Sequence, residues 1–241
     1  MKIVHVGTIS TVIVLFIGIA LVVPAYFRSD LNRPSIMLVF SIVSEDTPSD
    51  WLASILAVFR KYNVPATVFV TGKFASSHPE WIGDLADNID VGSQTYSYVS
   101  LTSITDYLLQ LDEVKKGKNA VDFAGNLDSR LFMAPFGDTD DNIYSLLNRS
   151  DISADFSYAD HYNKFYNGQF IKFDIDSFEG SKYSAEYFLS IETGGPLMIF
   201  YDDTTLAEKI DDFIFTLKSA RCNFVNASEI TGLSLTVRLE T

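Results

Sequence analysis

Strand-like and helix-like segments alternate from residue 35 to the end of the chain, and this alternation predicts an α/β protein. Some strand-like segments, such as residues 36–40 (IMLVF), are wholly apolar, as is typical of parallel strands buried on both faces. Hydrophobic residues make up 47% of the chain, which is enough for a substantial core. The sequence therefore predicts a parallel sheet that is either covered on both sides by helices or closed as a barrel.

The individual elements follow from local signals. Pro65 lies at the start of the second strand-like segment, where its missing N–H removes no ladder bond, and Pro79 falls near the first turn of a helix. Thr102 or Ser103 is expected to cap the helix that follows the third strand. The expected strands are residues 36–40, 63–72, 89–91, 130–135, 152–158, 170–175, 196–201 and 223–225, and the expected helices are residues 50–59, 78–86, 102–114, 141–148, 184–191 and 206–219.

The N-terminal segment is expected to be a membrane anchor. Residues 3–27 contain no Asp, Glu, Lys or Arg, and a helix that crosses a bilayer needs roughly 20 apolar residues. A cleaved signal peptide is the alternative, and the apolar run is long for one. The sequence thus predicts an anchor and linker at residues 1–34 and one globular domain at residues 35–241. The expected location is the cell membrane, with a single span and the domain outside the cytoplasm.

Charge and residue counts restrict the function. The net charge of −13 excludes nucleic acid as a partner, because its phosphates would be repelled. Cys222 is the only cysteine, so no intramolecular disulfide can form. The three histidines, His5, His78 and His161, leave few residues for a metal site or for acid–base catalysis.

A polar loop follows the third expected strand. Residues 92–101 (GSQTYSYVSL) place Gln94 and Tyr98 four positions apart, where two histidines would make half of a metal site. Together with residues 60–72 (RKYNVPATVFVTG), 134–137 (APFG) and 224–229 (FVNASE), this loop resembles the polysaccharide deacetylase family, also called the NodB-homology domain. The resemblance runs from about Ile36 to Leu233.

The resemblance implies an irregular (β/α) barrel with its site at the C-terminal ends of the strands. It also implies removal of acetyl groups from sugar polymers by a divalent metal held by one Asp and two His. A second Asp is the base, oriented by an Arg, and a further His is the acid. Residues 173–176 (FDID) match the family's fourth motif loosely. In the other motifs, Ser41 stands at the position of the base and Ile42 at that of the Asp ligand. Gln94 and Tyr98 stand at the positions of the two His ligands. Met133 stands at the position of the Arg, and Tyr201 at that of the acid.

These replacements predict a pseudoenzyme with no catalytic residues, no metal ligands and no cofactor. Amide and phenol groups are poor Zn²⁺ ligands beside imidazole. The expected partner is a cell-envelope glycan or an envelope protein, bound in the former cleft. The aromatic residues of that cleft either stack on sugars or fill the space that the metal site left. The expected cleft residues are Asp46, Gln94, Tyr98, Pro135, Phe136, Tyr201 and Asp202.

Two alternatives remain open at this level. One is an atypical carbohydrate deacetylase that holds Zn²⁺ or another divalent metal through Glu45 or Asp46, Asp202 and His161. The other is a structural scaffold in an envelope assembly. Fold alone does not decide between them.

Overall fold

The structure is a computed structural model that describes residues 33–47, 49–85, 88–159, 162–164, 174–193 and 195–239. Pro34–Thr241 form one compact unit. Within the described ranges, no helix is long and apolar enough to cross a membrane. The membrane anchor expected in the N-terminal segment lies at residues 1–32, outside those ranges.

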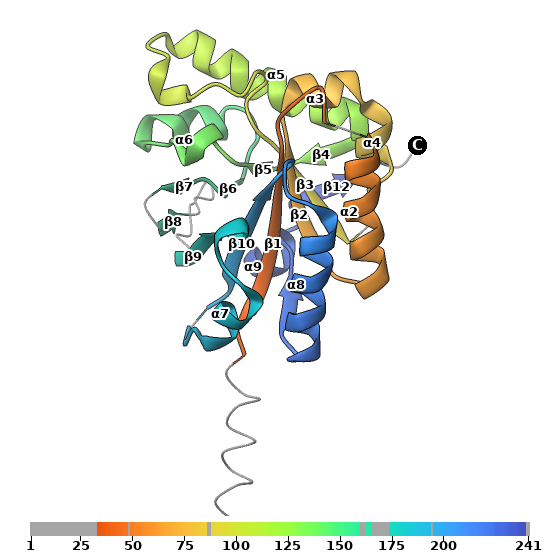
Figure 1. The fold of residues 1–241 in the computed structure, drawn as a ribbon. Coiled ribbons are helices and arrows are strands. Elements are labelled where there is room, and N and C mark those ends of the chain that lie inside the picture. The colour runs from red at the N-terminus through yellow and green to blue at the C-terminus, as the bar shows by residue number, and fades with distance from the viewer. Residues whose placement is uncertain are drawn as a thin grey trace, which may run out of the picture. The chain divides into compact units, whose positions relative to one another are not determined.

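A curled, mainly parallel sheet forms the centre of the molecule (Figure 1). Its strands run in the order β6-β5-β3-β2-β1-β10-β9-β8-β7, and β11 also pairs with β1. The β7-β8-β9 segment is antiparallel, and β12 and β4 form a small antiparallel pair of their own. The strands are β1 Ser35–Ile42, β2 Ala66–Val70, β3 Ile89–Ser93, β4 Leu127–Ser129, β5 Leu131–Phe132, β6 Ala154–Asp155, β7 Tyr158–Ala159, β8 Tyr162–Lys164, β9 Asp174–Glu179, β10 Leu197–Asp202, β11 Asn223–Val225 and β12 Thr236–Arg238.

Helices cover the convex face of this sheet, and α2 packs beside α8 over β1 (Figure 1). Short 3-10 turns, η1 Leu101–Ser103, η2 Pro135–Gly137 and η3 Gly180–Lys182, lie in the loops. The parallel α/β fold expected from the alternation is confirmed. The helices are α2 Ser49–Tyr62, α3 Gly72–Ser77, α4 Pro79–Gly83, α5 Tyr107–Gly125, α6 Asp141–Asn148, α7 Ala185–Ser190, α8 Ala207–Ser219 and α9 Ala227–Thr231.

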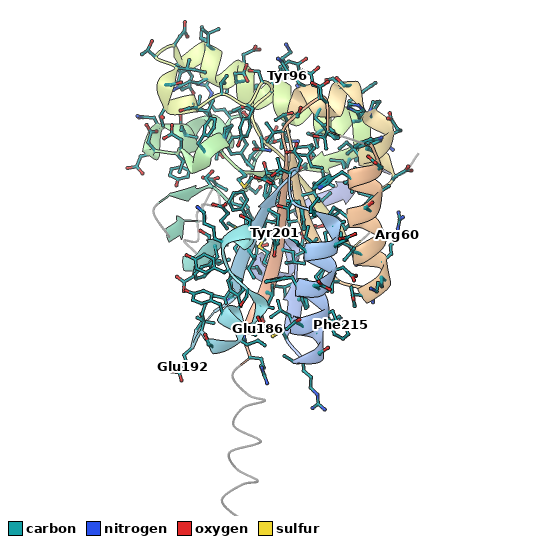
Figure 2. The ribbon with its side chains drawn as sticks, viewed as in Figure 1. Arg60, Tyr96, Glu186, Glu192, Tyr201 and Phe215 are labelled. Atoms are coloured by element: carbon teal, nitrogen blue, oxygen red, sulfur yellow. The ribbon has the colours of Figure 1, made fainter. Side chains whose placement is uncertain are left out.

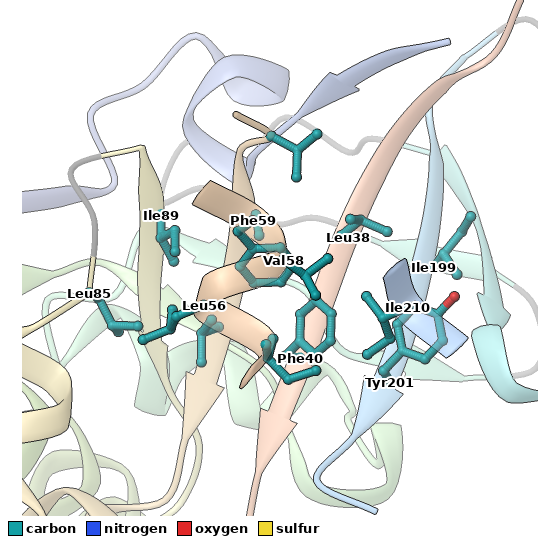
Figure 3. Packing of buried hydrophobic residues seen from close by; sticks show 14 of the residues in the cluster. Leu38, Phe40, Leu56, Val58, Phe59, Leu85, Ile89, Ile199, Tyr201 and Ile210 are labelled. Atoms are coloured by element: carbon teal, nitrogen blue, oxygen red, sulfur yellow. The ribbon is translucent and has the colours of Figure 1, made fainter. Parts of the chain in front are cut away.

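Side chains of the central strands alternate between two apolar layers. On β1, Leu38 and Phe40 belong to the large cluster under α2 and α8, whereas Met37 and Val39 belong to a second cluster inside the curl. Figure 3 shows the first layer, in which Phe40 lies among side chains of α2, β10 and α8. A strand position therefore faces either the helices or the interior, and this decides which side chains reach the site.

Several element boundaries differ from the sequence expectation, and two of the differences lie beside the loops at the C-terminal ends of the strands. The second strand ends at Val70 rather than at residue 72, and α3 begins at once because Thr71 Oγ1 accepts a hydrogen bond from the Phe74 N–H at 3.2 Å. The helix expected from residue 102 begins at Tyr107, where the Asp106 side chain caps it. Residues at the expected start form η1 instead.

Candidate functional site

The C-terminal ends of the parallel strands meet at one edge of the sheet. Paired registers bring the ends of β1, β2, β3, β5 and β10 together there. We call this edge the mouth; its loops are residues 43–47, 94–100, 133–138 and 202–205. In parallel α/β sheets, ligands bind at this edge because the loops converge there.

Gln94 follows β3 directly, and its side chain is fully buried. Its Nε2 donates hydrogen bonds to Ser41 Oγ at 3.0 Å and to the Phe69 carbonyl at 3.3 Å. Its Oε1 is buried and has no hydrogen-bond partner. The amide therefore closes the sheet interior below the mouth and leaves one acceptor unsatisfied, an uncommon state for a buried polar atom.

Two aromatic residues of the mouth have strained backbones. Tyr98, after β3, has φ 59°, and Phe136, after β5, has φ 62°. Bulky residues rarely adopt this left-handed region, and each instance costs about 1–3 kcal/mol. The two ring centroids lie 4.9 Å apart, and Phe136 is 63% exposed. Pro135 is buried at the start of η2, the short turn from which Phe136 points outward.

The charge around Tyr98 is negative. Burial raises the pKa of its hydroxyl, and the Asp203 and Asp202 carboxylates raise this pKa further, against the opposing effect of the Phe136 backbone N–H. The phenol is therefore neutral at physiological pH. It can donate and accept hydrogen bonds beside its exposed aromatic neighbour.

Two carboxylates at the end of β10, Asp202 and the following Asp203, hold loops in place. Asp203 Oδ2 accepts hydrogen bonds from the Val43 and Ser44 N–H groups, each at 3.3 Å, and from Thr47 Oγ1 at 2.6 Å. Asp202 Oδ1 accepts hydrogen bonds from Thr204 and Thr205 of its own turn. Asp46, the other expected acid, is exposed on the loop that Asp203 fixes.

Tyr201 does not lie at the mouth, contrary to its expected place in the cleft. It alternates with Phe200 and faces the helices, where its ring stacks on that of Phe40 with the ring centroids 5.4 Å apart (Figure 3). The centroid of the Phe213 ring lies 6.0 Å away. Burial leaves it 3% exposed and raises the pKa of its hydroxyl strongly. Its side chain therefore belongs to the layer between β10 and α8.

A buried acid that the sequence analysis did not select, Asp155 on β6, lies under the β5–α6 loop. Its Oδ1 accepts hydrogen bonds from the Ser157 N–H at 2.9 Å and from the Ser157 hydroxyl, which in turn accepts from the Ala134 N–H. Burial raises the pKa of Asp155 to about 6. The signal in the sequence was one acid inside an otherwise strand-like, uncharged run at residues 152–158.

One oxygen of Asp155 remains unsatisfied. Its Oδ2 and the Thr139 hydroxyl are both buried, and neither has a partner at hydrogen-bonding geometry. The Thr139 hydroxyl is nonetheless near enough to oppose the rise in the pKa of Asp155. In the described ranges no three His, Cys, Asp or Glu side chains gather as a metal-ligating group. His161 lies outside those ranges.

Comparison with known proteins identifies relatives of this fold. A family model described as polysaccharide deacetylase matches residues 28–154, more than half of the chain. Peptidoglycan-N-acetylmuramic acid deacetylase PdaA of Bacillus subtilis is 21% identical over 208 residues, which cover 86% of this chain and 74% of that protein. An uncharacterized 30.6 kDa protein of Geobacillus stearothermophilus is 22% identical over 213 residues, with the same coverage of each chain.

Solved structures show the same fold. A family 4 carbohydrate esterase from Streptomyces lividans, in complex with acetate, has a TM-score of 0.60 at 18% identity and covers 80% of this chain and 92% of its own. A family 4 pseudoenzyme from Bacillus anthracis has a TM-score of 0.60 at 15% identity, and the match covers 83% of this chain and 66% of that one. A mutant described as a pseudoenzyme with restored enzymatic activity has a TM-score of 0.61 at 16% identity, and the match covers 83% of this chain and 68% of that one.

Proposed function

Because the chain belongs to the polysaccharide deacetylase family, we propose that its mouth binds a cell-envelope glycan without metal-dependent deacetylation. The observation that carries this proposal is the Tyr98–Phe136 pair, in which both aromatic residues keep a strained backbone at the mouth. Strain of this kind persists at ligand-binding sites, because the surrounding structure holds it in place. Rings exposed there offer apolar faces to the CH faces of sugars.

The donor set at the mouth does not fit the metal site that the family resemblance implies. The Gln94 amide nitrogen donates its hydrogens to Ser41 and to the Phe69 carbonyl, and the remaining oxygen, Oε1, is a neutral donor that binds Zn²⁺ poorly beside imidazole. The Tyr98 phenol is a poor Zn²⁺ ligand beside imidazole, and burial raises its pKa above the ordinary value. Ile42 is buried in the apolar layer beneath the helices. These contacts support loss of the metal and therefore of the water activation that the metal would supply.

The glycan source is proposed from two observations. One similar protein is named as a peptidoglycan-N-acetylmuramic acid deacetylase. The apolar N-terminal segment of this chain suits an anchor that holds the domain outside the cytoplasm, beside that polymer. We propose membrane anchoring and an extracytoplasmic location on that basis.

Binding of N-acetylated glycan strands to the purified full chain tests this function. Phe136→Ala and Tyr98→Ala should each weaken binding at least about 5-fold, because stacking on an aromatic ring contributes about 1 kcal/mol. Phe123→Ala, which removes an exposed ring from α5 outside the mouth loops, is the matched control and should bind as the parent does. Equal affinity of all four proteins would contradict a site at the mouth.

One observation favours a second candidate, an atypical deacetylase. Asp155 is buried below the mouth with its pKa raised to about 6, a value suited to a general acid or base. The metal set expected for this reading is weakened, because Asp202 holds its own turn and Glu45 pairs with Lys73 at 3.9 Å. Acetate release that disappears in Asp155→Asn, with glycan binding retained, would favour this candidate.

A further inference from the structure

A second pocket lies between the η3–α7 segment and α8, and of the residues in the mouth loops only Thr205 lines it. Its volume is about 300 Å³, at the lower end of the range of small-molecule pockets, roughly 300–1,000 Å³. Tyr201 of β10 forms part of its lining, and residues of α7 and α8 form others. Figure 2 labels Tyr201 and Glu186, which contribute to this lining from β10 and α7.

The Tyr201 hydroxyl is a polar group without a partner inside this pocket. The residue is 3% exposed and its ring is held between Phe40 and Phe213, and burial is the one cause that raises the pKa of the hydroxyl, with no hydrogen bond from a described residue. The hydroxyl oxygen is not among the fully buried, unsatisfied side-chain atoms of the described residues, so it opens into the pocket that Tyr201 lines. There it can donate a hydrogen bond to a ligand and accept one from it.

The backbone around this hydroxyl leaves space for it. A Cβ on Gly180 would lie 2.2 Å from Tyr201 Cζ and 2.7 Å from the Tyr201 hydroxyl oxygen. Any larger residue at position 180 would displace the ring or close this end of the pocket. The glycine therefore allows the strand end to pass directly over the phenol.

The rim of the pocket favours a neutral ligand that is rich in donors. Thr205 Oγ1 donates to Asp202 Oδ1 at 3.3 Å, and Thr216 Oγ1 donates to the Asp212 carbonyl at 2.9 Å, so both hydroxyls offer acceptor lone pairs. Lys209 is accompanied by Glu186 and Asp212, all exposed, which gives no net positive charge for an anion. The Phe213 and Tyr183 rings supply apolar surface.

From this combination we propose that the pocket between α7 and α8 is a second saccharide site. It takes one sugar residue, whose hydroxyls donate to the threonine oxygens and bond to the Tyr201 hydroxyl, while its CH face lies against the rings. The site is separate from the mouth, since Tyr201 faces the opposite side of β10 from the sheet interior. It does not depend on the function proposed for the mouth.

A titration of the full chain with N-acetylglucosamine trisaccharide tests the second site, followed by NMR of labelled tyrosine side chains. The Tyr201 signal should shift in the parent. In Tyr201→Phe that signal is absent, so binding is followed at Tyr183, which lines the same pocket, and the affinity should fall about 3- to 10-fold. Tyr201→Phe should unfold at a temperature no lower than the parent, because it removes no protein hydrogen bond. Tyr62→Phe, on α2 outside the pocket, is the matched control and should bind with unchanged affinity.

The two sites give separable results. Tyr98→Ala should leave the Tyr201 titration unchanged, which would support two independent sites. A silent Tyr201 signal, or equal affinity in Tyr201→Phe, would overturn the second site whatever the mouth binds. Saturable binding of inorganic phosphate in place of the trisaccharide would also overturn it, because Lys209 would then define an anion site.

Discussion

At the scale of single residues, Asp155 makes the stability depend on pH. Its pKa is about 6 in the folded protein against 3.8 as the reference, so between these values the folded state binds more protons than the unfolded state. Stability should therefore fall as the pH rises from about 4 to about 6. Asp155→Asn removes this ionisation and should raise the free energy of unfolding at pH 7 by up to about 3 kcal/mol.

Urea unfolding at pH 4 and at pH 7 measures this effect. The parent and Asp155→Asn should differ little at pH 4 and diverge at pH 7. Asp112→Asn, an exposed acid on α5, serves as the control and should follow the parent at both values. A constant difference between parent and Asp155→Asn across this range would show that Asp155 does not ionise as described.

The resemblance to the polysaccharide deacetylase family selected part of the candidate site. Gln94, Tyr98, Pro135 and Phe136 were selected at motif positions of that family, and the structure brings them to one edge of the sheet because the ends of parallel strands meet there. Tyr201 was misplaced because an apolar run has no polar alternation to show which face a residue takes. Whether the mouth residues bind a ligand stays a prediction.

At the scale of elements, close packing of α5 against the mouth loop depends on Gly117. A Cβ there would lie 2.5 Å from the Gln94 carbonyl oxygen and 3.0 Å from Tyr96 N. Gly117→Ala should therefore lower the free energy of unfolding by about 1–3 kcal/mol and weaken glycan binding by moving residues 94–98.

The control for this change is Gly83→Ala on α4. A Cβ on Gly83 meets nothing within 4 Å, so alanine should be neutral or stabilise by up to about 1 kcal/mol. Thermal unfolding of both variants separates steric contact from helix propensity. Similar shifts in both would contradict the packing described for Gly117.

Asp203 links two elements, because it holds the loop after β1 from the end of β10. Asp203→Ala removes the acceptor of the Val43 and Ser44 N–H groups. We expect faster hydrogen exchange at these two amides and a loss of about 1–3 kcal/mol of stability. Asp112→Ala should change neither quantity. Unaltered exchange at Val43 would show that the loop is held by other contacts.

Element boundaries were predicted less well than element types, for local reasons. The helix expected from Thr102 begins at Tyr107, since the Asp106 carboxylate satisfies the first N–H groups. The hydroxyl of Thr102 or Ser103 could cap a helix in the same way as Asp106, and the sequence alone does not show which of these residues caps it.

At the scale of the whole molecule, the alternation of apolar strands and amphipathic helices sufficed to predict a parallel α/β sheet. It did not decide whether that sheet is covered on both sides or closed as a barrel. In the structure the sheet curls, and the described strands show no ladder between β6 and β7. The curl places one apolar cluster inside and a larger one beneath the helices, which leaves the loops of one edge free for a site.

The central claim is that this family member binds glycan at the mouth without removing acetyl groups. The most direct test measures acetate release and binding in one sample of the full chain with acetylated peptidoglycan strands. The measurement is repeated with added Zn²⁺ and with a chelator. The account predicts saturable binding and acetate at the level of the protein-free blank under all conditions. Catalytic acetate release that Zn²⁺ supports and the chelator abolishes would contradict it.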